Sequence, residues 1–257
     1  MHILVFCPLA PTTPMIFGRT VESIFRLEYD GPLHYRFHKG DNPYTGGNRP
    51  AYDNIAHNFN LAREAMLRGG YDALLTIEAD MIVPRDAASR LARCLEEGAD
   101  IAYGLYVWRH GNRKWSAYTS IDGIGGLSLS SDPERARAVW GQVVEVAGVG
   151  LGCTLISRRV LKSFPFHVAD DRCSCDWWLA VDAARAGMRQ VCDTGVVCGH
   201  ITLSPALQVL WPDVREERLY RVDYLAGPPP ENVIQREDGK VEIIVDRMGD
   251  TPVPKGV

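Results

Sequence analysis

The sequence predicts an α/β sandwich with a largely parallel central sheet. Short apolar runs that end in turn-forming residues alternate with amphipathic stretches through the first 100 residues, as in strand–helix–strand units. The length of 257 residues suits one domain with an appendage, and 46% hydrophobic and 23% charged residues are typical of a globular protein. A formal net charge of −4 argues against a general nucleic-acid binder.

The elements of the first half follow from apolar periodicity and from Pro and Gly at their ends. Continuous or alternating apolar runs predict strands, and spacing of three or four residues predicts helices. The expected elements are a strand at 2–9, a helix at 20–29, strands at 33–38 and 72–77 separated by a helix at 51–70, a helix at 85–98 opened by Pro84, and a strand at 99–108.

The second half is less regular. Residues 109–140 are polar and Gly-rich, and we expect a long loop or an excursion there. Residues 143–164 predict a strand, a Gly-rich turn, a second strand and a short helix. A helix is expected at 176–187, followed by one or two short strands within 189–200.

The composition changes near Pro205, which divides the chain into a domain at 1–204 and an appendage at 205–257. "GPPPEN" (227–232) is a linker or rigid turn, and Asp238-Gly239 marks a candidate hairpin. The edge of such a hairpin could pair with a second copy of the chain, which would make a homo-oligomer.

Seven scattered cysteines and no secretory signal favour a reduced, cytoplasmic compartment. The apolar N-terminus lacks a basic lead and a cleavage site, so it predicts a first strand. No run approaches the length of a membrane span.

Two carboxylates, Glu78 and Asp80, follow the strand expected at 72–77. In an extended chain, residues i and i+2 point the same way, so both would project from the carboxyl end of that strand, where α/β folds bind ligands. Such a pair can hold Mg²⁺ or Mn²⁺ together with diphosphate oxygens. The alternative is a solvated strand end or a salt bridge to Arg85 or Arg49.

Three segments together resemble the family-2-like group of GT-A glycosyltransferases. They are the acidic segment "LLTIEADMIVP" (74–84), the Gly-rich strand and helix "GVGLGCTLISRRVLKSFPF" (148–166), and "CDWWLAVDAARAGMRQVCDTGVVCGH" (175–200) with its late histidine. The resemblance covers about residues 1–203. It implies a GT-A (nucleotide-diphospho-sugar transferase-like) three-layer sandwich and a metal-dependent, inverting transfer of a sugar to an acceptor hydroxyl. UDP is the favoured donor nucleotide and GDP the alternative.

The resemblance assigns metal binding to Asp80, with His200 as a further ligand. Glu78 stands where an Asp is usual and would meet the ribose or the metal shell. For His200, a buried histidine bonded to a backbone carbonyl is the alternative.

Asp176 matches the family's catalytic base, which removes the acceptor proton. A helix N-cap or first-turn acid is the alternative. Cys175 stands where relatives often have Glu, so the usual dyad is incomplete. Gly150 and Trp177 fall on the acceptor side, although tryptophans are more often core residues. The resemblance leaves four acceptor classes open: a saccharide, a lipid-linked glycan, a protein or a modified DNA base.

The resemblance places the nucleotide base and ribose at the loop after the first strand, beginning at Pro8, and at Asp41 after the next strand. Asp41 could accept from a uracil N–H or serve only in the turn "GDNP". Arg49 could pair with the diphosphate or be an exposed arginine without a role.

Three other functions compete with this interpretation. A nucleotidyltransferase shares the architecture, but "PLAPTTP" lacks the Gly-rich basic loop that holds a triphosphate. A zinc module could use the cysteines at 173, 175, 192 and 198 with His200, although the spacing is unusual for zinc. A catalytically inactive GT-A-like binding domain is the third.

Overall fold

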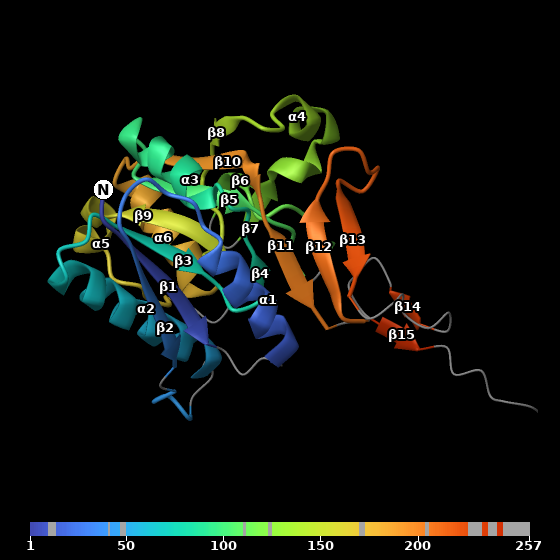
Figure 1. The fold of residues 1–257 in the computed structure, drawn as a ribbon. Coiled ribbons are helices and arrows are strands. Elements are labelled where there is room, and N and C mark those ends of the chain that lie inside the picture. Colours follow the sequence, from blue (N-terminus) through green and yellow to red (C-terminus); the bar gives the residue numbers. More distant parts are fainter. Residues whose placement is uncertain are drawn as a thin grey trace, which may run out of the picture.

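The structure, a computed structural model, describes residues 1–9, 14–40, 42–46, 50–109, 112–122, 125–169, 173–203, 206–225, 233–235 and 241–243. Within these ranges the largest sheet has seven strands (Figure 1). In spatial order they are β2 (Leu33–Lys39), β1 (Ile3–Leu9), β3 (Ala73–Ile77), β9 (Cys153–Ser157), β5 (Ile101–Leu105), β10 (Gln190–Val197) and β8 (Val143–Glu145).

The central sheet is mostly parallel, as predicted. Strands β2, β1, β3, β5 and β10 run in one direction, whereas β9 and the edge strand β8 run against their neighbours. Every residue of β3 and β5 is buried, because both faces of the sheet are covered. The parallel strands therefore end at a common edge.

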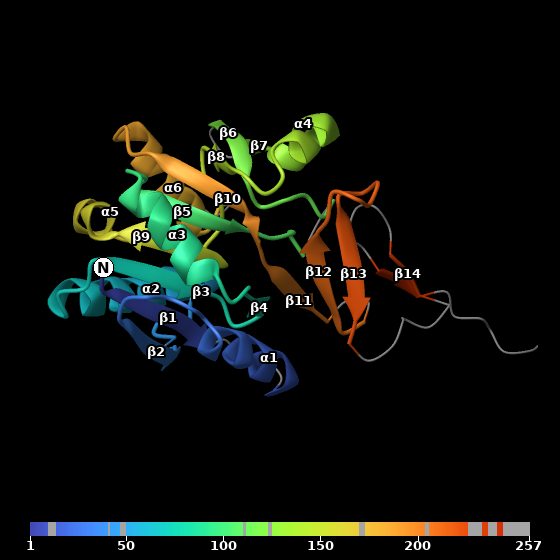
Figure 2. The ribbon, with the colours of Figure 1, turned by 45° about the horizontal axis from the view of Figure 1, so that its top comes forward.

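Helices cover both faces of this sheet, which completes the predicted three layers. Helix α2 packs against β1 and β3 and also contacts α5 and α6, whereas α3 packs against β5, β9 and β10 on the other side (Figure 2). Their bounds are α1 (Pro14–Phe25), α2 (Pro50–Arg68), α3 (Ala87–Glu96), α5 (Arg158–Ser163) and α6 (Cys175–Arg185).

Helix α1 corrects the helix expected at 20–29. It begins at Pro14 and ends at Phe25. Proline at the first helical position fits because its missing N–H would have no partner there. The apolar pattern marked the middle of this helix but neither of its ends.

The described part of the middle segment is folded, so of the two alternatives expected for 109–140 the structure favours the excursion over the long loop. It holds a hairpin of β6 (Tyr118–Asp122) and β7 (Gly125–Ser128), a short 3-10 turn η1 (Leu129–Ser131) and helix α4 (Pro133–Ala138). Trp115 is fully buried and donates from Nε1 to the Leu219 carbonyl at 2.6 Å. This buried tryptophan anchors a segment whose polar surface resembled a loop.

A second sheet joins the tail to the main body (Figure 1). Its strands, in order, are β13 (Tyr220–Tyr224), β12 (Gln208–Pro212), β11 (Gly199–Thr202) and β4 (Met81–Ile82). The chain after residue 204 thus begins by pairing with β11, and the division at 204/205 stays a prediction.

In the tail, β14 (Val233–Gln235) pairs antiparallel with β15 (Val241–Ile243), and the hairpin turn at Asp238-Gly239 stays a prediction. Its turn lies outside the described residues. Among the helices that the structure describes, none combines the length and the apolar character needed to cross a membrane.

Candidate functional site

The acidic segment forms a turn between β3 and β4. The Glu78 N–H donates to the Gly152 carbonyl at 3.2 Å, and the Met81 N–H returns to the Glu78 carbonyl at 3.1 Å. This corrects the expectation that Glu78 and Asp80 project side by side from an extended strand. The carboxylates are neighbours because the turn brings them to the same edge of the sheet.

The surroundings of Glu78 disfavour the ionised form of its carboxyl group. Burial, followed by the negative charges of Asp80 and Asp176, raises its pKa to about 7, while His200 and Arg109 pull the pKa down in part. Cys7 lies near the end of β1. Burial, followed by the negative charges of Asp80 and Glu78, raises the pKa of its thiol to about 12. Residues from the β3–β4 turn, β1, α6 and β11 therefore lie close enough to shift one another's pKa values.

Asp80 and His200 face each other across paired strands. Met81 pairs with His200 in the β4–β11 ladder, and the Ile201 N–H donates to the Asp80 carbonyl at 2.8 Å. The His200 Nε2 atom lies 3.6 Å from Asp80 Oδ2, and its Nδ1 lies 2.8 Å from the Val107 carbonyl oxygen.

The tautomer of His200 follows from the Val107 contact. A carbonyl oxygen only accepts, so Nδ1 must carry a proton, and in a neutral imidazole Nε2 then presents a lone pair to Asp80. Two acceptors at this separation need a proton or a cation between them. Donation of the other ring N–H to a backbone carbonyl is also how metal-ligating histidines are commonly oriented. The pair thus fits a divalent cation, and the carbonyl-bonded alternative for His200 is compatible with ligation.

Arg109 also pairs with Asp80. Its Nη1 contacts Asp80 Oδ2, the same oxygen that faces His200. Burial acts to raise the pKa of Asp80, but a hydrogen bond from a protonated His200 imidazole, its positive charge and the guanidinium of Arg109 outweigh burial, so the pKa is lowered. Of the arginines named above as alternative partners, Arg85 instead bonds Glu28 at 2.6 Å, and Arg49 lies outside the described residues.

Asp176 lies in the first turn of α6, behind Ser174 at the N-cap, and its Oδ1 accepts from the Trp177 N–H at 2.9 Å. Burial raises its pKa despite these hydrogen bonds. Gly150 lies beside it: a Cβ built on Gly150 would be 3.0 Å from Asp176 Oδ2 and would overlap the Tyr106 hydroxyl. The Gly-rich turn before β9 and the start of α6 therefore meet at the carboxyl edge of the sheet.

A row of four aromatic rings runs beside these carboxylates. Tyr106 lies edge-on to His200 at 5.5 Å and 6.3 Å from Trp108, and Tyr118 lies 6.5 Å from Trp108 and 5.5 Å from Trp177. Trp177 thus lies beside these carboxylates, and its place near the acceptor stays a prediction. The buried Trp115 is a core residue that packs on Trp140.

The structure brings together Glu78, Asp80, His200, Asp176, Gly150 and Trp177 from the predicted set. Pro8 is near the carboxyl end of β1, opposite His38. Asp41 and Arg49 fall outside the described residues. Sequence reasoning missed Arg109, Tyr106 and Cys7 as site residues, because each reaches the site through contacts distant in sequence.

Within the described residues, no group of three or more His, Cys, Asp or Glu side chains is placed to hold a metal ion. Asp80 and His200 would supply two protein ligands, and a hard cation completes its shell with water or phosphate oxygens. The cysteines of the alternative zinc module do not form a four-ligand cluster in the part of the chain that is described.

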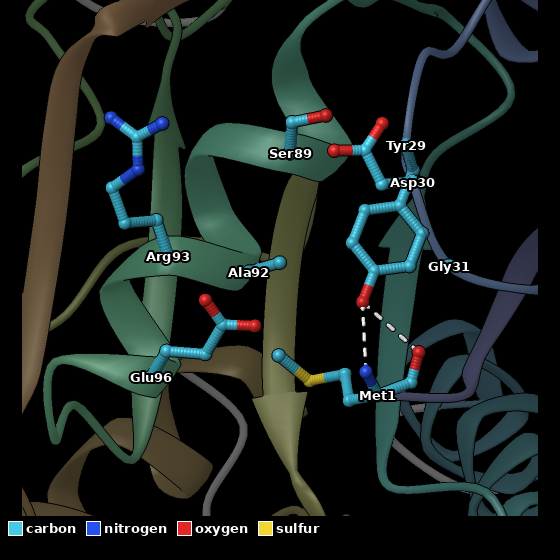
Figure 3. Close-up of a pocket in the computed structure, with 8 residues that line it drawn as sticks. All are labelled: Met1, Tyr29, Asp30, Gly31, Ser89, Ala92, Arg93 and Glu96. Atoms are coloured by element: carbon cyan, nitrogen blue, oxygen red, sulfur yellow. Dashed lines mark hydrogen bonds between the residues drawn. The ribbon is translucent and has the colours of Figure 1, made fainter.

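A separate cavity of about 340 Å³ lies far from this site, at the amino end of β1 (Figure 3). It lies between the start of the chain and α3, and the Tyr29 hydroxyl there contacts the backbone of Met1 at 3.0 and 3.1 Å. Parallel strands present their ligand-binding ends at the opposite edge, so this cavity has no part in the candidate site.

Comparison with known proteins shows the fold. No protein-family model matches the sequence, and no curated protein matches it. Among solved structures, A197 from STIV is similar, with a TM-score of 0.56 and 17% identity over 90% of this chain and 100% of that one. GalNAc-T7, solved with UDP, GalNAc and Mn²⁺, is similar with a TM-score of 0.50 and 10% identity. That match covers 80% of this chain and 45% of GalNAc-T7.

The chain has a GT-A-like fold. At these identities the likeness concerns the fold, and the family-2-like grouping stays a prediction. The cluster of Glu78, Asp80, Asp176 and His200 lies at the edge of the GT-A-like sheet where its parallel strands end.

Proposed function

We propose that the chain is a metal-dependent glycosyltransferase that moves a sugar from a nucleotide-diphosphate donor, favourably a UDP-sugar, to an acceptor hydroxyl with inversion. The observation that carries this proposal is the separation of 3.6 Å between Asp80 Oδ2 and His200 Nε2, with His200 Nδ1 held by the Val107 carbonyl oxygen. The GT-A-like fold and the Mn²⁺ and UDP of the GalNAc-T7 structure support it.

Asp80 and His200 would hold Mn²⁺ or Mg²⁺, which would neutralise the charge that develops on the leaving diphosphate. Glu78, with a pKa of about 7, is suited to meet the ribose as a hydrogen-bonding group or to ionise when a cation binds. Pro8, Asp41 and Arg49 are the proposed nucleotide contacts.

Asp176 would serve as the general base. Its raised pKa makes it a stronger base than an exposed aspartate, and its ionised form would take the proton of the acceptor hydroxyl. The acceptor oxygen then bonds to the anomeric carbon from the face opposite the leaving group, while the bond from that carbon to the phosphate oxygen breaks. Gly150 and Trp177 would flank the acceptor, because both contact the Asp176 region.

A competing function is a GT-A-like binding domain without activity. One observation favours it: Asp80, the proposed metal ligand, forms an ion pair with Arg109. Hydrolysis of the donor separates the two, because a glycosyltransferase with a cation and a donor bound releases sugar slowly to water. A pure binding domain would bind the nucleotide and release none.

The test is a thermal-shift screen of UDP, GDP and other nucleoside diphosphates, each with and without Mn²⁺, followed by measurement of UDP-sugar hydrolysis. We expect stabilisation by one nucleotide only when metal is present; a ligand at 100 times its Kd stabilises by about 2.7 kcal/mol. Equal stabilisation with and without metal would refute metal dependence. Binding without any hydrolysis would favour the inactive domain.

A further inference from the structure

Arg109 belongs to a short loop that contacts both proposed metal ligands. The loop is closed at its base by a bridge between Val107 and Trp115 and by the Trp108 N–H, which donates to the Lys114 carbonyl at 2.9 Å. The Val107 carbonyl accepts from His200 Nδ1, and two residues later the Arg109 guanidinium pairs with Asp80. One loop therefore orients the imidazole and supplies a positive charge to the carboxylate.

The guanidinium and a divalent cation cannot share this place. Arg109 Nη1 and His200 Nε2 both face the same oxygen, Asp80 Oδ2. A cation bound between Asp80 and His200 would take that oxygen, and its charge would repel the guanidinium at contact distance. Binding of the cation therefore requires the Arg109 side chain to move.

The Arg109 side chain is more exposed than the carboxylate that it contacts. The arginine side chain is 44% exposed, whereas the Asp80 side chain is 14% exposed. The carboxylate is fixed by the β4–β11 ladder, but the arginine reaches it from the surface. A movement of the Arg109 side chain away from Asp80 would leave the β4–β11 ladder in place.

We propose that Arg109 is a latch that holds Asp80 when no metal is bound and moves to the donor's diphosphate when a divalent cation takes its place. This inference rests on the proposed function and adds a regulation of the same site. The diphosphate would be bridged to the cation at Asp80, so its oxygens would lie within reach of the released side chain. The planar guanidinium matches phosphate oxygens in pairs. Metal and donor then bind cooperatively. The cation displaces Arg109 from Asp80, and the diphosphate stabilises the displaced guanidinium, so each ligand favours the arginine position that the other requires.

Direct Mn²⁺ binding tests the latch without relying on activity. Electron paramagnetic resonance of free Mn²⁺ would be measured for the wild-type chain, Arg109→Gln and the control Arg85→Gln, each with and without UDP. Arg85 is also exposed and also pairs with a carboxylate, that of Glu28, at 2.6 Å. Arg109→Gln should bind Mn²⁺ alone about tenfold more tightly than the wild type, and UDP should enhance its Mn²⁺ affinity about tenfold less. Arg85→Gln should match the wild type.

The outcomes separate the latch from the proposed function. If Arg109→Gln and the wild type bind Mn²⁺ equally, with the same enhancement by UDP, the latch is wrong and metal-dependent transfer stands. A weaker Mn²⁺ affinity in Arg109→Gln also overturns the latch. If no variant binds Mn²⁺ even with UDP, the metal-dependent function fails and the latch fails with it.

Discussion

The ring of Tyr106 fills the space that a side chain at position 150 would need. A Cβ on Gly150 would overlap the Tyr106 hydroxyl and lie 3.0 Å from Asp176 Oδ2. Gly150→Ala should therefore lower the free energy of unfolding by about 1–3 kcal/mol and reduce turnover, because Tyr106 or Asp176 must shift. Urea denaturation measures the first effect and a donor-hydrolysis assay the second.

Two variants make the Gly150 result specific. Gly18→Ala, where a Cβ meets nothing within 4 Å, should not be destabilised. Adding Tyr106→Phe to Gly150→Ala should restore part of the lost stability, since the clashing hydroxyl is removed. A double variant as unstable as the sum of its single changes would show that the hydroxyl is not the obstacle.

Asp80→Ala should abolish the joint stabilisation by nucleotide and Mn²⁺ and leave the fold intact. The reason is that Asp80 supplies the oxygen facing His200, while its backbone still pairs with Ile201. Thermal shifts with UDP, Mn²⁺ and both together measure the effect. Asp223→Ala, at an exposed carboxylate on β13, is the control. A response like that of the parent would remove Asp80 from the site.

Asp176→Asn should lower kcat by a factor of about 100 to 10,000 while binding of UDP and Mn²⁺ is retained. An amide keeps the shape of the carboxylate but cannot take the acceptor proton. Because burial raises the pKa of Asp176, the wild-type rate should rise with pH through a value above that of an ordinary aspartate. Pre-steady-state turnover across pH measures both effects. An unchanged rate would exclude Asp176 as the base.

Glu78 should make the metal-free chain less stable as pH rises from about 4.5 to about 7. Its pKa is about 7 in the folded chain against 4.5 as the reference. Between these values the folded chain holds a proton that the unfolded chain has lost, so raising the pH favours unfolding. Urea denaturation at several pH values should show this slope flattened in Glu78→Gln and kept in Glu96→Gln, a change at an exposed residue of α3. The same slope in Glu78→Gln would contradict the assignment.

Asp193→Ala should lower the free energy of unfolding by about 3 kcal/mol. Asp193 is buried in β10, where Arg90 reaches it from α3 with two hydrogen bonds of 2.8 and 2.6 Å, and the Gly195 N–H adds a third of 2.9 Å. Loss of the carboxylate leaves these donors without their acceptor. Equilibrium denaturation is the measurement, and a loss below about 1 kcal/mol would show that water replaces the ion pair.

The sequence was most informative where local rules decide structure. The continuous apolar runs of β1, β3 and β5 could be recognised because strands buried on both faces need apolar side chains throughout. The start of α2 at Pro50 follows from the same kind of local chemistry.

Contacts between distant residues were not predictable in this way. The placement of β9 between β3 and β5, antiparallel to both, depends on pairing between strands that are far apart in the sequence. Arg109 reaches Asp80 across 29 positions of sequence, and nothing in the local pattern of either residue marks the other. The sequence therefore indicated the candidate metal ligands Asp80 and His200, but it did not indicate that the Arg109 guanidinium pairs with Asp80.

The spacing between Asp80 and His200 comes from main-chain pairing of two strands, with side-chain packing in a secondary role. Evolution can therefore exchange neighbouring residues, including the base and the aromatic row, and preserve the gap between these two groups. Such a scaffold could change its chemistry or its acceptor while inheriting from its backbone the same separation between the Asp80 and His200 positions.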